Sequence, residues 1–285
     1  MNSKAIKRQL LAAIAMVLVA AIALGSSTYA WFVASGSVKA TGMKVQVQAE
    51  SGILIREHKA VDNTDVFSTV AEIQMNSAKL YPTSTPDLKA WYHNNSNTAT
   101  DAKGGIDVTD GSKYTAISTT DSGIFSQYAL KKQFAIRSAT QTPIDGKIAI
   151  ESVSISEGGT TTQDLYKSVR VGITVSTGAK TSSPEVYIYA PLCDDASWKL
   201  TAAYKTTEAP NATAVNVTEN KAVSKTGDVL NDTFELSNGQ IPITEAGLIV
   251  DVYVWFEGED PNCKTENITG RTPDDLTATV VFKQV

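Results

Sequence analysis

The densest group of residues able to do chemistry is the stretch EGEDPNC, from Glu257 to Cys263. It holds three carboxylates, Glu257, Glu259 and Asp260, within four residues. Carboxylate oxygens that lie close together bind Ca²⁺, so the stretch is a weak candidate for a calcium site. Its spacing matches no calcium-binding loop, however. A solvated acidic turn, bent at Pro261, is the simpler interpretation of the same residues.

The histidines and serines follow no catalytic pattern. His58 and His93 lie outside any HExxH or HxxxH spacing, and no CxxC pair accompanies them. A zinc protease needs three ligands and a water-activating carboxylate at defined spacing. The chain also has no GxSxG elbow, no P-loop and no dinucleotide-binding motif. We therefore expect a protein that is not an enzyme and that binds no cofactor.

The N-terminal region has the pattern of an export signal. Three basic residues precede an apolar run of fifteen residues, 10–24. Small residues at Thr28 and Ala30 suit a signal peptidase that cuts between Ala30 and Trp31. At 1.5 Å per residue the apolar run reaches about 22 Å, which is short of a hydrocarbon core of about 30 Å. We predict that residues 1–30 are a cleaved leader; a retained membrane anchor is the alternative.

Removal of the leader makes the chain more acidic. The chain has 25 Lys and Arg and 30 Asp and Glu, and the leader contains three of the basic residues and no acidic one. The remaining 22 basic and 30 acidic residues give a net charge of −8. Such a chain, without a basic cluster, is a poor candidate for binding nucleic acid or an anionic membrane. We expect a secreted protein, located outside the cell or at its surface, with no membrane contact after cleavage.

The two cysteines, Cys193 and Cys263, both follow the leader. An exported chain with an even number of thiols can form a disulfide, and two buried free thiols fit the same count. A bridge needs Cα atoms about 5.5 Å apart, a distance that the sequence does not give. Both alternatives therefore stay open.

Hydrophobic periodicity beyond the leader is that of β-strands. Apolar and polar residues alternate with period two, and turn residues separate the runs. The alternation is clearest at residues 43–49, 134–136, 148–150, 169–175, 186–188, 249–256 and 276–282. Many short strands with one polar face indicate an antiparallel sandwich. We predict an all-β fold, a jelly-roll-like antiparallel β-sandwich formed by one domain, residues 43–285.

Four segments interrupt this alternation. Residues 65–79 and 162–168 have apolar spacing compatible with short helices. Residues 81–122 and 206–232 are rich in Asn, Thr, Ser, Asp and Gly, which predicts long polar loops. The expected sandwich therefore carries long loop insertions and one or two short helices.

Residues 31–42 connect the leader to the first strand. They start with Trp31 and Phe32, and Val33 and Val38 follow among small residues. The edge of a sheet has unpaired N–H and C=O groups, with which an extended segment of another chain can pair. We interpret the segment as a candidate donor strand, so the expected partner is a second copy of the chain in a head-to-tail homopolymer.

The end of the leader also resembles a known family. The stretch GSSTYAWF, with Thr28, Tyr29, Ala30, Trp31 and Phe32, followed by VKATGMKVQVQAESGILI, resembles the TasA/camelysin family of Gram-positive exported proteins. The rest of the chain resembles it in pattern only. The resemblance implies a SipW-type signal peptidase as partner during export, a jelly-roll fold, and polymerisation into biofilm-matrix fibres through the N-terminal strand. The metalloprotease label of some camelysin-like members is not carried over, because the chain offers no zinc-binding pattern.

Three functional hypotheses follow. The first is a secreted structural subunit of a surface fibre or biofilm matrix. The second is a monomeric cell-surface adhesin or glycan-binding module, in which Trp91 and Tyr92 stack on sugar rings. The same two rings could instead attach their loop to the core. The third and weakest hypothesis is a hydrolase that uses Glu257.

Overall fold

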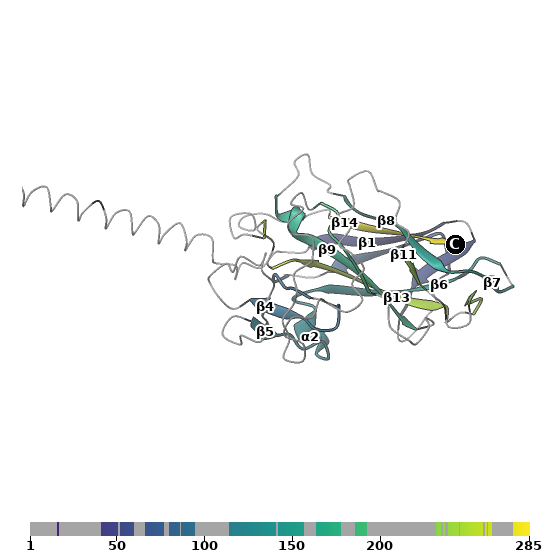
Figure 1. Cartoon of the computed structure of the whole chain (residues 1–285), viewed down its shortest axis with the longest axis horizontal. Helices are drawn as coiled ribbons and strands as arrows, with labels where there is room; N and C mark the ends of the chain where they lie inside the picture. The colour runs from purple at the N-terminus through teal and green to yellow at the C-terminus, as the bar shows by residue number, and fades with distance from the viewer. Residues whose placement is uncertain are drawn as a thin grey trace, which may run out of the picture.

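The structure is a computed structural model of the chain (Figure 1). It describes residues 16, 41–50, 52–59, 66–76, 80–85, 87–94, 114–140, 142–156, 164–177, 186–192, 232–234, 236, 239–244, 246–258, 260, 262–263 and 276–285. Among these residues, no helix is long and apolar enough to cross a membrane.

Several sequence predictions concern residues outside the described ranges. These are the leader apart from residue 16, its cleavage site, the donor segment up to residue 40, one cysteine, one carboxylate and most of the second predicted loop. The named residues are Ala30, Trp31, Phe32, Val33, Val38, Cys193 and Glu259, together with 206–231. All of these stay predictions.

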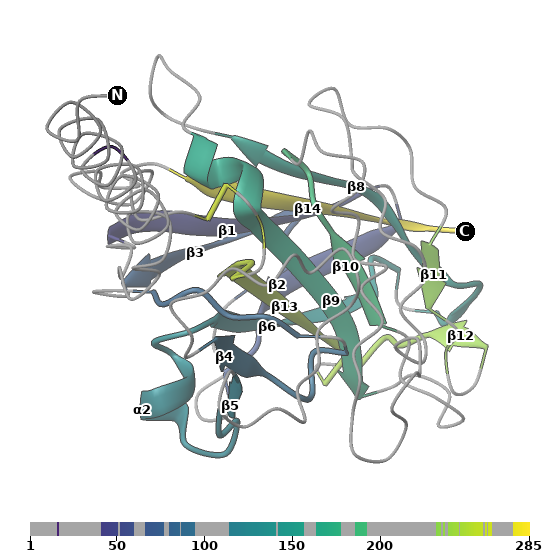
Figure 2. The ribbon, with the colours of Figure 1, turned by 60° about the vertical axis from the view of Figure 1, so that its left-hand side comes forward.

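Two five-stranded sheets pack face to face as a β-sandwich (Figures 1 and 2). The first sheet has the order β11 (Asp232–Phe234), β8 (Ile148–Ser156), β14 (Thr277–Gln284), β1 (Thr41–Ala49), β3 (Val70–Asn76). The second has the order β10 (Val186–Tyr189), β9 (Val169–Thr177), β13 (Leu248–Phe256), β6 (Leu130–Ser138), β2 (Ile53–Glu57). The predicted all-β sandwich is therefore confirmed, while its jelly-roll connectivity stays a prediction.

Neighbouring strands of the two sheets are antiparallel with one exception. β1 and β14 run parallel, with Val47 beside Val280. Parallel neighbours cannot be joined by a tight hairpin. In chain order, β1 is the first and β14 the last of the described strands. The predicted antiparallel pairing thus holds for the other neighbours, and the first sheet is mixed at its centre.

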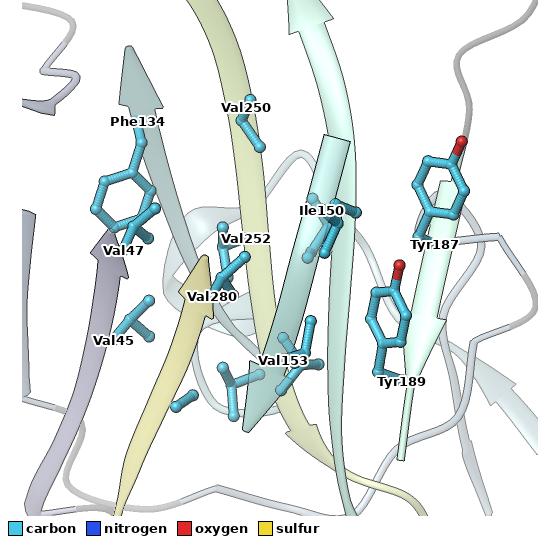
Figure 3. Packing of buried hydrophobic residues seen from close by; sticks show 14 of the residues in the cluster. Val45, Val47, Phe134, Ile150, Val153, Tyr187, Tyr189, Val250, Val252 and Val280 are labelled. Carbon is cyan, nitrogen blue, oxygen red and sulfur yellow. The ribbon is translucent and has the colours of Figure 1, made fainter. Parts of the chain in front are cut away.

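The core lies between the two sheets. Along β1, Val45 and Val47 are buried while the residues between them are only partly buried, which is the alternation that the sequence predicts. Figure 3 shows Val45, Val47 and Val280 from the first sheet facing Phe134 and Val250 from the second. Burial of these apolar side chains is the main source of the fold's stability.

A third layer covers the outer face of the second sheet. It contains β4 (Tyr92–Asn94), β5 (Tyr114–Ala116) and α2 (Ser122–Phe125), which lie together on one side of the sandwich (Figure 1). We call the described part of residues 80–129 the outer layer. Because both faces of the second sheet are covered, all nine residues of its central strand β13 are buried. The predicted loop 81–122 therefore contains two short strands and the start of a helix.

The helix predictions had mixed outcomes. A 3-10 helix, η2 (Asp164–Ser168), lies within the predicted segment 162–168 and confirms it. The helix predicted at 65–79 is wrong, because residues 70–76 of this segment form β3, in which Ile73 pairs with Val45. The spacing of its apolar residues imitates a helix, but pairing with a neighbouring strand decides the conformation. A further two-stranded sheet joins β7 (Ile144–Asp145) to β12 (Gln240–Ile241).

Candidate functional site

The first carboxylate of the candidate calcium site is buried in the protein. Glu257 follows the last residue of β13, and its exposed fraction is 2%. The Ser84 hydroxyl donates a hydrogen bond to one carboxylate oxygen. The Trp255 indole N–H donates to the other oxygen over 3.2 Å. Glu257 thus connects the end of β13 to the outer layer.

The second carboxylate belongs to a buried ion pair. Asp260 Oδ2 lies 2.7 Å from Nη2 of Arg170, and both side chains have no exposed surface. Asp260 Oδ1 accepts a hydrogen bond from the backbone N–H of Asn262 at 2.8 Å. Arg170 Nη1 also donates to the Lys167 carbonyl at 3.0 Å. The pair therefore joins the turn after β13 to the junction between η2 and β9.

These contacts change the interpretation of the acidic stretch. The solvated turn expected from the sequence is wrong, because Glu257 and Asp260 are both buried. Their carboxylate oxygens accept hydrogen bonds from protein groups, so these two residues give the calcium hypothesis no support. Within the described part of the chain, no three His, Cys, Asp or Glu side chains could together hold a metal ion. The stretch acts as a structural junction.

Cys263 lies in the same junction. Among the described residues it has no disulfide partner, and its thiol is buried. Burial, helped by the charge of Asp260, raises the pKa of this thiol far above the ordinary value. A thiol with a raised pKa stays protonated and unreactive at neutral pH. Its possible partner Cys193 lies outside the described residues, so the disulfide stays a prediction.

Trp91 attaches the outer layer to the second sheet. Its exposed fraction is 1%, and its ring packs edge-on against Trp255 and Phe125, with centroids 5.2 and 5.1 Å away. Its indole N–H donates to the Leu88 carbonyl at 3.1 Å. Of the two interpretations of this ring, attachment to the core is confirmed. Tyr92 remains half-buried, and burial raises the pKa of its phenol.

Three other half-buried rings meet at the surface of the outer layer. The Tyr128 ring centroid lies 5.7 Å from that of Tyr81 and 5.5 Å from that of His93. His93 belongs to β4, and its Nδ1 lies 3.1 Å from the Pro82 carbonyl oxygen. No sequence pattern marks this group, because the three residues are distant in the chain and form no motif.

The two long sides of the sandwich differ in how their strand edges are completed. On one side, Ile55 of β2 and Ser68 exchange backbone hydrogen bonds of 2.8 and 2.9 Å, which joins the two sheets. On the other side, β14 pairs with β8 as far as Ser156. β11 pairs with only three residues of β8, 148–150. Among the described strands, none pairs with the outer side of β8 from residue 151 to 156.

Comparison with known proteins gives no match: no family model, no curated protein and no solved structure matches the chain. A functional proposal therefore rests on the contacts of the described residues and on the sequence resemblance described above. Within those contacts, the buried carboxylates and Trp91 have structural roles. Among the described strands, β8 is left unpaired on its outer side from residue 151 to 156.

Proposed function

We propose that the protein is a secreted structural subunit of an extracellular surface fibre or biofilm matrix. Copies polymerise head-to-tail when residues 31–42 of one subunit, starting at Trp31, add a strand to the sandwich of the next. The TasA/camelysin resemblance supports this proposal from the sequence. The jelly-roll connectivity and the cleaved leader are part of the same proposal. The open strand edge supports it from the structure.

The observation that carries the proposal is the incomplete pairing of β8. Eight of the nine residues of β8 pair with β14 on one side, but among the described strands only three pair with β11 on the other. The open edge has N–H and C=O groups to which an extended segment can bind. Each backbone hydrogen bond formed there adds a net stabilisation of about 0.5–1.5 kcal/mol. An added strand of a few residues therefore gives a stable contact between subunits.

The position of β1 makes the preceding segment a suitable donor. β1 lies between β14 and β3, so both of its sides are paired. Residues before Thr41 therefore leave from the end of a central strand rather than from an edge of the sheet. Eight extended residues span about 27 Å, enough to reach a neighbouring copy.

Deletion of residues 31–37 from the mature protein tests the proposal. The donor strand is lost while every described strand is retained, so we expect folded monomers and no fibres. Light scattering and negative-stain microscopy measure the assembly, and circular dichroism checks the fold. A variant that keeps the length but replaces Trp31, Phe32 and Val33 by Ser separates the effect of the side chains from that of chain length. Fibres of unchanged abundance after the deletion would refute the proposal.

The alternative function is a monomeric cell-surface adhesin or glycan-binding module. The half-buried rings of Tyr81, His93 and Tyr128 favour it, because rings with polar tips can contact both the apolar and the polar faces of a sugar. A binding module stays monomeric as concentration rises, whereas a fibre subunit grows. Retention of a polysaccharide by a monomeric protein, and its loss in Tyr128→Ala, would favour this alternative.

A further inference from the structure

Pairing and charge divide β8 into two halves. The first half, 148–150, has β11 on its outer side. The register between β14 and β8 then shifts, so that Glu151 has no cross-strand partner in β14 and forms a bulge. Its carboxylate lies 3.5 Å from Nζ of Lys283. A bulge and a charged pair thus mark the end of the covered half.

The second half of β8 has no charge. Residues 152–156 have the sequence Ser-Val-Ser-Ile-Ser. Val153 and Ile155 face the core with exposed fractions of 0% and 8%, and the serines between them face outward. Natural edge strands are commonly protected by Lys, by Pro or by a very short length. This half has none of these protections, which is expected of an edge that receives another strand.

Each other outer edge of the described sheets is short, joined or charged. β9 extends past the four residues that pair with β10, but only by Val169 and Arg170 at one end and by residues 175–177 at the other. β11 and β10 contain three and four residues, and β2 is joined to Ser68 by two backbone hydrogen bonds. β3 is longer, but it carries the exposed residue Glu72, whose carboxylate lies 3.1 Å from Nζ of Lys44. A charged pair on an edge strand disfavours the approach of another strand.

We propose that residues 152–156 of β8 are the acceptor edge and that residues 31–38 of a second copy pair with it. This inference rests on the proposed function. The five acceptor residues extend over about 17 Å and the eight donor residues over about 27 Å, so about three donor residues remain to cross between copies. Residues 31–38 contain no charged side chain, so an uncharged strand meets an uncharged edge although each mature chain has a net charge of −8.

The geometry also defines the competing occupant of this edge. Lys44 and Ser156 both pair with Thr277, so β1 begins at the same end of the sheet where β8 ends. The chain's own segment before β1 therefore starts two strand spacings, about 10 Å, from the β8 edge. A test must distinguish pairing between two chains from pairing within one chain.

Cross-linking between two different variants makes this distinction. Two mature variants are prepared, one with Val33→Cys and the other with Ser154→Cys, and each also carries Cys193→Ser. They are mixed during assembly, oxidised and digested for mass spectrometry. Cys263 stays in place because its buried thiol is unreactive. We expect a peptide pair that joins positions 33 and 154, which can form only between chains. The matched control mixes Val33→Cys with Val70→Cys on β3, which exposes the new thiol and keeps Glu72 in place, and it should give no link.

Each other outcome overturns a defined part of the inference. Fibres with a link to position 70 overturn the choice of edge and leave the proposed function intact. A link that forms in a chain with both Val33→Cys and Ser154→Cys, but not in the mixture, shows folding back within one chain and overturns the acceptor. Absence of polymer from the unmodified mature chain overturns the proposed function as well.

A charge placed on the acceptor edge gives a second readout. Ser154→Lys should lower the polymer yield about tenfold or more, because an edge lysine opposes strand addition. Thr279→Lys is the control, since Thr279 is the cross-strand partner of Ser154 but lies on β14, which is paired on both sides. It should leave the yield unchanged. Both variants should unfold at similar denaturant concentrations, and an unchanged polymer yield in Ser154→Lys overturns the inference.

Discussion

At the scale of single residues, Arg170 and Asp260 depend on each other. Each is a charge with no exposed surface, and each would be unfavourable in the interior without the other. Their contact, together with the Asn262 and Lys167 backbone groups, satisfies much of this requirement. A buried pair of this kind fixes the geometry of a junction more than it adds stability.

Removal of one partner should therefore be costly. Asp260→Ala leaves the Arg170 guanidinium buried without its counter-charge, and we expect a loss of about 3–5 kcal/mol in the free energy of unfolding. Denaturant titration of the monomer measures it. The control is Glu72→Ala, which breaks the half-exposed pair with Lys44 and should cost about 1 kcal/mol or less. Equal small losses in both variants would contradict the structural role of the buried pair.

The ionisation of Tyr253 should make the free energy of unfolding depend on pH. Burial, followed by the charge of Asp251, raises the pKa of its phenol above the ordinary 10.0. Burial lowers the pKa of Lys131, but the hydrogen bond to Asp251 and further contacts raise it above 10.5 overall. Both groups bind their protons more tightly in the folded protein than in the unfolded chain. Their contribution to the free energy of unfolding is therefore fully present below about pH 10, and it is lost as the pH rises further.

Unfolding free energies measured between about pH 8 and pH 12 check this expectation. Tyr253→Phe keeps the ring that packs beside Trp91 and removes the titrating hydroxyl. Its stability should fall less steeply above pH 10 than that of the unmodified protein. The same slope in both proteins would mean that Tyr253 does not contribute to the pH dependence.

At the scale of elements, Leu88 of the outer layer packs into the space left by the missing side chain of Gly172 in the second sheet. Leu88 has a φ of 59°, a conformation uncommon for a residue with a side chain, and its N–H donates to Thr85 Oγ1 at 2.9 Å. This conformation directs the Leu88 side chain toward Gly172 of β9. A Cβ atom at Gly172 would lie 2.5 Å from one Leu88 methyl carbon and 2.8 Å from the other.

A pair of substitutions tests this fit. Gly172→Ala should lower the free energy of unfolding by about 1–3 kcal/mol because it overpacks the contact with Leu88. In a chain that already carries Leu88→Ala, the same change should cost clearly less, since the methyl carbons are gone. Thermal or denaturant unfolding of the four proteins gives the coupling. Additive effects would show that Leu88 does not limit the space at Gly172.

The sequence predicts those elements whose burial follows from their own pattern. The sequence predicts β14 from the alternation of Ala278, Val280 and Phe282, and the structure buries all three between half-exposed residues. The sequence predicts a helix in place of β3, because Val66, Val70 and Ile73 recur at helical spacing. What decides its conformation is pairing with β1, and no local pattern reports that partner.

The candidate site was predictable only in part, for a related reason. The acidic stretch stood out by composition, but its charge partner Arg170 lies 90 residues away and carries no mark in the sequence. Acidic residues are most often exposed, which made a solvated turn the natural expectation. The burial of Trp91 depends on contacts with Phe125 and Trp255, which are distant in the sequence and which no local pattern indicates.

At the scale of the whole molecule, the sandwich is asymmetric. One long side is joined through Ile55 and Ser68, and the other ends in the open half of β8. With the proposed donor segment and the proposed acceptor edge, each copy would have two different binding surfaces. Such a head-to-tail contact does not close on itself and allows growth without a fixed end. The polymer that we propose therefore needs no second kind of subunit.

The parallel pair of β1 and β14 has a consequence for the time course of folding. β14 is the last strand of the described fold, yet it lies between β1 and β8 in the first sheet. Contacts between residues so distant in sequence form slowly, because the chain must lose much of its freedom before they stabilise it. As the chain is synthesised from its N-terminus, the centre of the first sheet stays vacant until residues 277–284 arrive. We therefore expect that the first sheet becomes continuous only late in folding, when β14 pairs with both β1 and β8.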